Sequence, residues 1–318
     1  MFFLQFRMGL LVAFLFAILY AVVVVFGTSM GVGNFYFYLI ISFVMMFIQF
    51  MVGPKMVEWS MRVRYVKREE YPGLYAMVED QAQRAGIPMP RVCVAAVGIP
   101  NAFAFGRGRG DGRVCVSEGI MKLLNDEELK AVIGHEITHI KNRDVVTITM
   151  LSVIPILMYR LAWHLMWFGG RRGRDNSSGA MLGLIAFLFY FITNLLVLYA
   201  SRIREYFADR GSIELGNRPS AMATALYKLV YGSARTGKDA IRNVEGLKAF
   251  FVNDPSRALN EIRELRDLDL DNSGTIDMAE LSVLRGQELK MSFGDRMMEM
   301  MSTHPNMLKR IKHLSQLS

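Results

Sequence analysis

Four long apolar runs dominate the pattern of hydrophobic and polar positions along this chain of 318 residues. They comprise Met8 to Phe26, Phe35 to Val52, Val145 to Phe168 and Gly179 to Ala200. Each is about long enough to cross a bilayer as an α-helix. The first run lacks a clear small-residue cleavage site and is soon followed by another run, so we interpret it as a retained anchor rather than a signal peptide. The pattern predicts a multi-pass α-helical membrane protein.

Basic residues flank the first two runs. Arg7 precedes the first run, and five Lys or Arg residues lie between positions 55 and 68, after the second. The positive-inside rule places both flanks in the cytoplasm. Part of the net charge of +8 lies in this belt, which faces anionic lipid; no basic stripe with interleaved aromatic residues indicates a nucleic-acid partner. The third run, interrupted by Pro155, Arg160 and His164, either crosses the bilayer or dips in without crossing.

The residues His135-Glu136-Ile137-Thr138-His139 carry the candidate chemistry. Two histidines four residues apart lie on one face of a helix and can bind one tetrahedral zinc ion. Glu136 is turned by about 100° from His135, so its carboxylate lies beside the metal, where it can take a proton from zinc-bound water. Asn125 to Glu128 predicts a capped helix start that places the motif well inside a helix. A helix with two solvated histidines is the alternative.

The apolar runs that follow the motif predict a third ligand. His139 lies about six residues before the third run, and Glu205 lies about five residues after the fourth. An antiparallel hairpin of the two runs would return Glu205 to the depth of His139 on the same membrane face. We therefore expect Glu205 to bind the zinc ion, with Asp209 one turn further orienting a ligating histidine. Without the hairpin, an ion pair of Glu205 with a neighbouring arginine would be the simpler interpretation. Asp144 and Asp209 are the alternative candidates for the third ligand.

The chain resembles the HtpX-type membrane metalloproteases in four stretches that occur in the family's order. They are PNAFAFG at 100–106, HEITHIKNRD at 135–144, SRIREYFAD at 201–209 and STHPNMLKRI at 302–311. The related CAAX prenyl proteases share some of these motifs but have more spans and a longer chain. The resemblance implies that His135, His139 and Glu205 bind one Zn²⁺ per chain and that Glu136 is the catalytic acid–base. It also implies that His304, and with it Arg310, stabilises the oxyanion.

A small sheet is predicted beside the motif. Short strands are expected at residues 91–96, 102–105 and 113–117. The glycine-rich residues 106–112 read as a hairpin tip rather than a phosphate cradle, because no helix follows them. The resemblance implies that an edge strand binds the substrate main chain by strand addition. The residues concerned are Asn101, Ala102, Phe103 and Ala104.

Residues 269–280, with the sequence DLDNSGTIDMAE, fit the twelve-residue EF-hand loop. Gly274 would make the sharp turn of such a loop. Its predicted Ca²⁺ ligands are Asp269, Asp271, Ser273, Thr275 through its carbonyl, Asp277 and Glu280. An acidic helix–turn–helix without an ion is the alternative, since only one hand is visible. A bound ion here would stiffen the connection that positions His304.

Six consecutive parts are predicted. Two transmembrane helices (1–54) precede a metalloprotease core (55–144), a membrane hairpin (145–200), the third-ligand helix (201–254), the EF-hand-like segment (255–290) and the His-Pro motif with a final helix (291–318). The predicted fold is a multi-pass α-helical membrane protein with a cytoplasmic α+β zincin-like metalloprotease domain.

The predicted function is that of a zinc endopeptidase in the cell membrane, with its active site facing the cytoplasm. The resemblance implies a role in protein quality control and the stress response, with misfolded or damaged membrane proteins as substrates. Polypeptides and the lipid bilayer are thus the expected partners. A CAAX-type prenyl protease and a calcium-responsive membrane scaffold with a non-catalytic zinc site are the alternatives.

Overall fold

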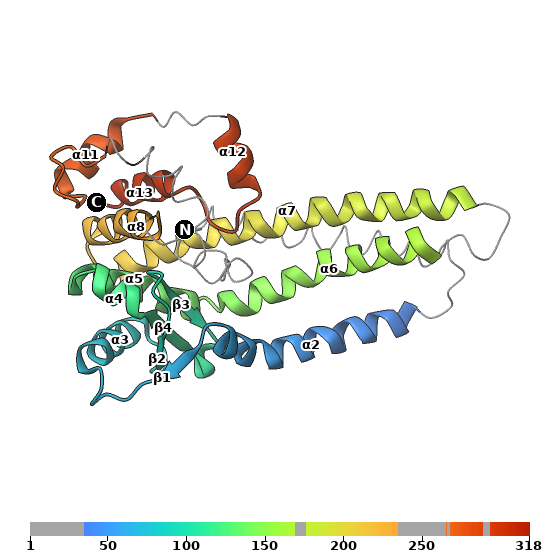
Figure 1. Ribbon diagram of the computed structural model, residues 1–318, viewed down its shortest axis with the longest axis horizontal. Helices are drawn as coiled ribbons and strands as arrows, with labels where there is room; N and C mark the ends of the chain where they lie inside the picture. Colours follow the sequence, from blue (N-terminus) through green and yellow to red (C-terminus); the bar gives the residue numbers. More distant parts are fainter. Residues whose placement is uncertain (1–34, 169–175, 235–264, 266–267, 289–292) are drawn as a thin grey trace. The chain divides into compact units, whose positions relative to one another are not determined.

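The computed structural model describes residues 35–168, 176–234, 265, 268–288 and 293–318, and Figure 1 draws these as ribbons. The first predicted membrane run, Met8 to Phe26, lies outside the described residues. The same holds for most of the chain between residues 235 and 267. The predicted motifs all fall within the described residues.

A four-stranded sheet lies beside the predicted motif. Its strands are β1 (Val63–Tyr65), β2 (Arg91–Ala95), β3 (Ala102–Phe105) and β4 (Arg113–Ser117). The strand order is β1-β2-β4-β3, with β2 and β4 parallel and the two outer pairs antiparallel. The three predicted strands are therefore confirmed. β1 was not predicted, because it is only three residues long and lies within the basic belt.

A glycine-rich hairpin tip connects β3 and β4, as predicted, and contains the short 3-10 helix η1 (Arg109–Asp111). Gly106 has a φ of 141°, which L side chains rarely adopt. A Cβ atom at this position would lie 2.2 Å from the backbone oxygen of Asp111. Glycine is therefore required where the chain leaves β3.

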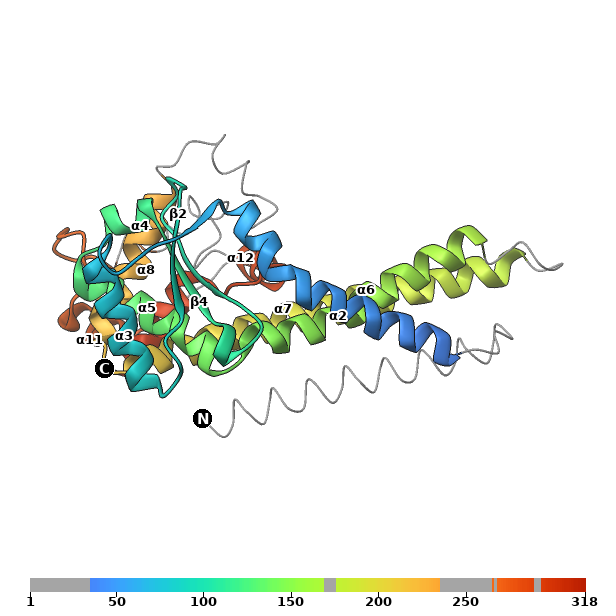
Figure 2. The same cartoon turned by 90° about the horizontal axis from the view of Figure 1, so that it is seen from below.

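Helices cover one face of the sheet, and Figure 2 shows α3, α4, α5 and α8 on the same side of the strands. The valines of β2 and β4 point to this side and share a core with Val132 and Ile133 of α5. The helices of this part of the chain are α3 (Pro72–Ala85), α4 (Glu118–Leu123), α5 (Asp126–Lys141), α8 (Pro219–Ala234), α11 (Met278–Gly286), α12 (Phe293–Met300) and α13 (Met307–Ser315). On the opposite face, Cys93 and Cys115 pack with Val57 and Met61.

The start of α5 is fixed by the predicted capping box. The Asn125 side chain accepts a hydrogen bond from Glu128 N, and the Glu128 side chain accepts one from Asn125 N. Glu128 also accepts hydrogen bonds from Lys228 Nζ of α8, at 2.7 and 3.0 Å. This carboxylate therefore fixes both the first turn of the motif helix and its neighbour α8.

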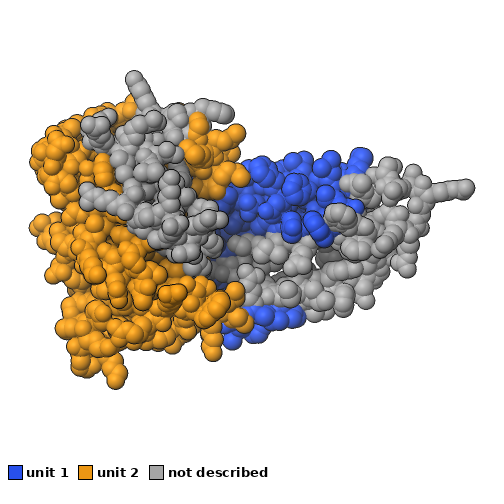
Figure 3. Space-filling model, viewed as in Figure 1, with its two compact units in different colours: residues 1–51, 146–203 blue, residues 52–145, 204–318 orange. Residues whose placement is uncertain are grey.

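The chain divides into two compact units, coloured separately in Figure 3. One comprises residues 1–51 and 146–203, and the other comprises residues 52–145 and 204–318. The first unit contains most of three apolar helices, α2 (Phe35–Ser60), α6 (Asp144–Phe168) and α7 (Asn176–Glu214).

The helices α6 and α7 form the predicted antiparallel hairpin. Leu151 and Ile154 of α6 pack with Val197 and Ala200 of α7, and further clusters continue along the pair. The outer side of α7 exposes large apolar residues, such as Met181, Leu184 and Leu188. Among the described helices, the segment Met181–Glu214 is long and apolar enough to cross a membrane. The α7 helix continues without a break past the predicted boundary at residue 200.

Candidate zinc centre

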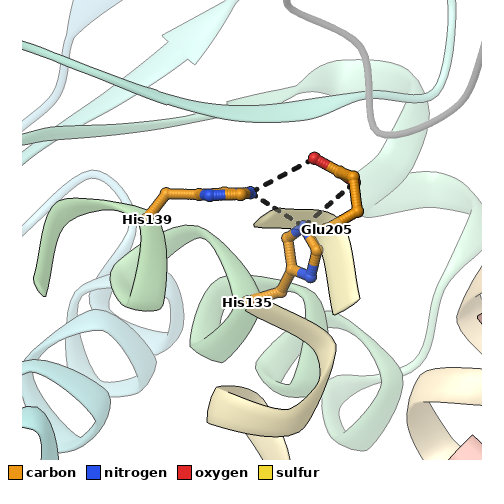
Figure 4. Close-up of side chains that lie close together, drawn as sticks. All are labelled: His135, His139 and Glu205. Atoms are coloured by element: carbon orange, nitrogen blue, oxygen red, sulfur yellow. Dashed lines mark hydrogen bonds and ion pairs between the residues drawn. The ribbon is translucent and has the colours of Figure 1, made fainter. Parts of the chain in front are cut away.

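The three predicted zinc ligands point toward one another (Figure 4). The Nε2 atoms of His135 and His139 lie 3.1 Å apart, and each lies 3.6 Å from an oxygen of Glu205. Two nitrogen ligands of one tetrahedral zinc ion are about 3.3 Å apart, given zinc–nitrogen distances of about 2.0–2.1 Å. The donor set and its spacing therefore fit one zinc ion, as the sequence predicted.

Close contact between α5 and α7 brings these ligands together. A Cβ atom on Gly134 of α5 would meet Ser212 and Asn217, and one on Gly211 of α7 would lie 2.3 Å from Thr138. Two glycines therefore let the helix backbones approach where larger residues would separate them. The Ser212 hydroxyl crosses the same contact and donates a hydrogen bond to Ala131 O at 2.6 Å.

Each histidine of the predicted ligand set contacts a carboxylate through its other ring nitrogen. His135 Nδ1 lies 2.9 Å from Asp209 Oδ1, and His139 Nδ1 lies 2.6 Å from Asp144 Oδ2. Such contacts fix the tautomer and the ring plane, so that each Nε2 faces the other residues of the predicted ligand set. The sequence predicted the position of Asp209. It did not predict the contact of Asp144 with His139, which depends on the turn at Arg143.

Burial and neighbouring charges shift the pKa values of the two histidines in opposite directions. Burial, and then the charge of His135, lower the pKa of His139 to about 4. At neutral pH this imidazole is therefore uncharged and able to bind a metal. Burial alone would lower the pKa of His135, but its contact with Asp209 and the charges of Asp209 and Glu205 raise it above the ordinary value. Zinc binding must then displace a proton from His135 when that ring is protonated.

Residues 68–318 match Peptidase family M48. The chain belongs to this family. A protease HtpX homolog from Methanothermobacter thermautotrophicus is 46% identical over 227 residues, which cover 71% of this chain and 86% of that protein. A second, from Pyrococcus abyssi, is 34% identical over 318 residues, which cover 98% of this chain and 95% of its own length. The predicted resemblance to the HtpX-type metalloproteases, and the prediction of a metalloprotease, are thus confirmed.

A solved structure, that of S. mikatae Ste24p, has the same fold as this M48 peptidase. The two chains superpose with a TM-score of 0.51 at 15% sequence identity. The match covers 98% of this chain and 65% of the Ste24p chain.

The M48 motif glutamate, Glu136, is held inside the protein. Only 4% of its surface is exposed, and it follows His135 directly on α5. A step of about 100° around the helix turns its carboxylate away from the line of the two histidines. This position suits an acid–base beside the metal rather than a ligand.

The C-terminal His-Pro motif of the M48 peptidase reaches the predicted ligand Glu205 from α13 and the turn before it. His304 Nδ1 lies 3.4 Å from Glu205 Oε2, and His304 Nε2 is buried without a hydrogen bond to a described residue. Arg310 Nη1 lies 3.0 Å from the same Glu205 oxygen, and its other nitrogens bind Asp209. Arg310 thus contacts the carboxylates of Glu205 and Asp209, whereas the resemblance implied that it stabilises the oxyanion. That role stays a prediction for both residues.

The predicted substrate strand lies next to the motif helix. β3 is the outermost strand of the described sheet and contacts α5. Ala102 and Ala104 face the α5 side, whereas Phe103 and Phe105 pack on the opposite face. Asn101 precedes the strand and is buried, and its backbone N–H donates to Ser117 Oγ at 2.8 Å.

The EF-hand-like loop brings together three of its four predicted carboxylate ligands. Carboxylate oxygens of Asp269, Asp271 and Glu280 lie within 4.8 Å of one another. Asp277 is outside this group and caps the start of α11, where it accepts a hydrogen bond from Glu280 N. Glu280 in turn accepts hydrogen bonds from the backbone of Leu270 and Asp277. Calcium binding by this loop stays a prediction.

Proposed function

We propose that this M48 peptidase is a zinc-dependent endopeptidase of the cell membrane that cleaves misfolded or damaged membrane proteins at the cytoplasmic face. The observation that carries this proposal is the convergence of His135, His139 and Glu205 within 4.8 Å. Bound zinc would supply a Lewis acid that polarises the scissile carbonyl and acidifies water. The apolar helix α6 follows the motif helix after a short turn, and the apolar helix α7 carries Glu205; both observations support a membrane location.

Glu136 supplies the acid–base chemistry. Its carboxylate takes a proton from the attacking water and passes it to the leaving amine. Asp209 and Asp144 hold the two imidazoles with Nε2 toward the metal. His304 is the better candidate for the oxyanion, because its Nε2 is buried without a hydrogen bond among the described residues, while Arg310 is engaged by carboxylates.

The substrate main chain binds along Asn101 to Ala104. Backbone hydrogen bonds to an outer strand give affinity that depends little on side chains, which suits an enzyme for varied unfolded polypeptides. Peptides that are N-methylated at single backbone positions test this. Methylation near the scissile bond should raise KM, whereas methylation several residues away should not. An equal effect at all positions would contradict strand addition.

The decisive experiment compares the wild type with Glu136→Gln in the full-length purified protein, with zinc and an unfolded membrane protein. Glu136→Gln should keep its zinc and lose cleavage. Glu127→Gln is the matched control, because Glu127 lies on the same helix with its side chain 69% exposed. Cleavage by Glu136→Gln at the wild-type rate would refute the mechanism. A wild type that binds zinc but cleaves nothing would favour the scaffold, and one that cleaves only a farnesylated tetrapeptide tail would favour a CAAX-type prenyl protease.

A second metal site, for Ca²⁺, is proposed at residues 269–280. The gathering of Asp269, Asp271 and Glu280 supports it. Thr224 of α8 holds the loop, since its hydroxyl donates to Ile276 O at 3.0 Å and accepts from Ile276 N at 2.9 Å. Calorimetric titration with Ca²⁺ should show one site that Glu280→Gln abolishes and Glu288→Gln keeps. Full protease activity of Glu280→Gln with and without Ca²⁺ would exclude a regulatory role.

A further inference from the structure

A carboxylate–arginine pair lies behind His139. Asp144 Oδ2 contacts His139 Nδ1 at 2.6 Å, and Asp144 Oδ1 forms an ion pair with Arg204 Nη2. Asp144 is 8% exposed and Arg204 is 6% exposed. Because both charges are largely removed from water, their relative position is fixed more strictly than that of a surface pair.

The two partners of this ion pair lie where the chain leaves and re-enters the second compact unit. The chain leaves the second compact unit after Val145 and returns to it at Arg204. Asp144 is the first residue of α6, and Arg204 immediately precedes the predicted ligand Glu205 on α7. One ion pair therefore joins the outgoing and the returning segment of the membrane hairpin, directly beside the metal ligands.

The other histidine has a similar arrangement built from different elements. His135 contacts Asp209, and Asp209 is held by Arg310 of α13. Each ligating histidine thus has a carboxylate behind it and an arginine behind the carboxylate. The repeated arrangement indicates that the arginines orient the carboxylates, because each arginine contacts the carboxylate that contacts the histidine.

We propose that Arg204 is a positioning residue for zinc, acting on His139 through Asp144. The inference rests on the zinc site proposed above. Arg204 fixes the plane of the Asp144 carboxylate, which then holds the His139 ring with Nε2 toward the other two ligands. Contacts of this kind behind a metal ligand typically change metal affinity by about 10- to 100-fold.

The dependence on Asp144 makes the inference testable by a double-mutant cycle. Zinc affinity is measured by competition with a chromophoric chelator for the wild type, Arg204→Gln, Asp144→Asn and the double variant. Arg204→Gln should weaken zinc binding by about 10-fold or more, and Asp144→Asn by at least as much. The double variant should bind zinc no more weakly than Asp144→Asn. The other effect of Arg204 on the site is its positive charge near His139 and Glu205, which disfavours a cation and is removed with the side chain.

A spectroscopic readout and a control separate positioning from general stability. The visible absorption of the Co²⁺-substituted protein should change in Arg204→Gln and return toward the wild-type spectrum in Arg204→Lys, which retains the charge. Arg210→Gln is the control, since Arg210 lies on the same helix in an exposed pair with Glu214. If Arg204→Gln folds poorly, zinc affinity can still be measured on the double variant, because that variant removes both buried charges together.

The outcomes are distinct. Additive losses in the double variant, or unchanged zinc affinity and Co²⁺ spectrum in Arg204→Gln, would overturn the proposed role of Arg204. A wild-type protein that fails to bind zinc would instead overturn the proposed zinc centre.

Discussion

Arg310 holds both carboxylate oxygens of Asp209, a residue 101 positions earlier in the chain. Its Nε atom lies 2.9 Å from Oδ2 and its Nη2 atom 2.6 Å from Oδ1. Both side chains are fully buried. A bidentate ion pair thus joins α13 to α7, the helix that carries the predicted ligand Glu205. Asp209 also contacts His135.

Replacement of Arg310 should therefore affect both stability and metal binding. Arg310→Met leaves Asp209 as a buried charge without its arginine partner, and loss of one member of such a pair typically costs about 3–5 kcal/mol of unfolding free energy. Chemical denaturation measures this loss, and zinc competition measures the weaker metal binding. Arg285→Met on the exposed surface of α11 is the control. A variant as stable as the wild type would show that the pair is dispensable.

The helix contact at Gly211 should be sensitive to a single methyl group. A Cβ atom there would lie 2.3 Å from the Thr138 side chain, so Gly211→Ala must push α5 and α7 apart. We expect a loss of about 1–3 kcal/mol in stability, as for other overpacked cores, together with weaker zinc binding. Gly73→Ala is the matched control because nothing lies within 4 Å of a Cβ atom there. Equal zinc affinities of the two variants would contradict the proposed close approach.

The capping box of the motif helix should contribute measurably to the stability of the protein. Asn125→Ala removes the acceptor for Glu128 N, which lies 2.9 Å away. The expected loss is about 1 kcal/mol in thermal or chemical unfolding, without loss of the ligand set. Asn142→Ala at the other end of α5 makes a fair comparison, since the cap contacts there come from the backbone. Equal losses in the two variants would speak against the capping box.

The metal-free protein should lose stability on acidification. The pKa of His139 is lowered by burial to about 4, below its ordinary value of 6.5. Between these values the unfolded chain binds a proton that the folded protein does not, so the free energy of unfolding falls as pH falls through this window. Since one pKa unit corresponds to about 1.4 kcal/mol, the contribution is at most about 3 kcal/mol.

Thermal unfolding of zinc-free protein between pH 7 and pH 4.5 measures this effect. In His139→Gln the decline over the same range should be shallower. The raised pKa of His135 acts at higher pH and in the opposite sense, because its stabilising proton is lost as pH rises. An identical decline in the wild type and His139→Gln would assign the acid sensitivity to other groups.

The grouping of His135, His139 and Glu205 was predictable because the helix period and the length of the apolar runs correspond to known distances. The first placed His135 and His139 on one face, and the second returned Glu205 to them. The contact of Asp144 with His139 was not predictable in the same way. It depends on Arg143, whose φ of 57° ends α5 and lets α6 begin with Asp144 directed back at the histidine. A left-handed arginine has no signal in the sequence.

The elements of the fold also divide into those that have a local signal in the sequence and those that do not. Alternating apolar residues predicted the longer strands, and the capping box predicted the start of α5, since both signals are local. The direction of Arg310 was missed because it depends on how α13 packs against distant segments. The motif alone could not tell whether its positive charge would serve a carboxylate or an oxyanion.

The continuity of α7 has a consequence for how proteins of this kind can change in length. The helix runs from Asn176 to Glu214 without a break, so the apolar part and the predicted ligand Glu205 share one register. Deleting a single residue from the apolar part would turn Glu205 by about 100° about the helix axis relative to that part and shift it by about 1.5 Å. Three or four residues, close to one full turn, would nearly restore its direction. Insertions or deletions in this segment should therefore be tolerated when they add or remove about one helical turn, but not when they add or remove one residue.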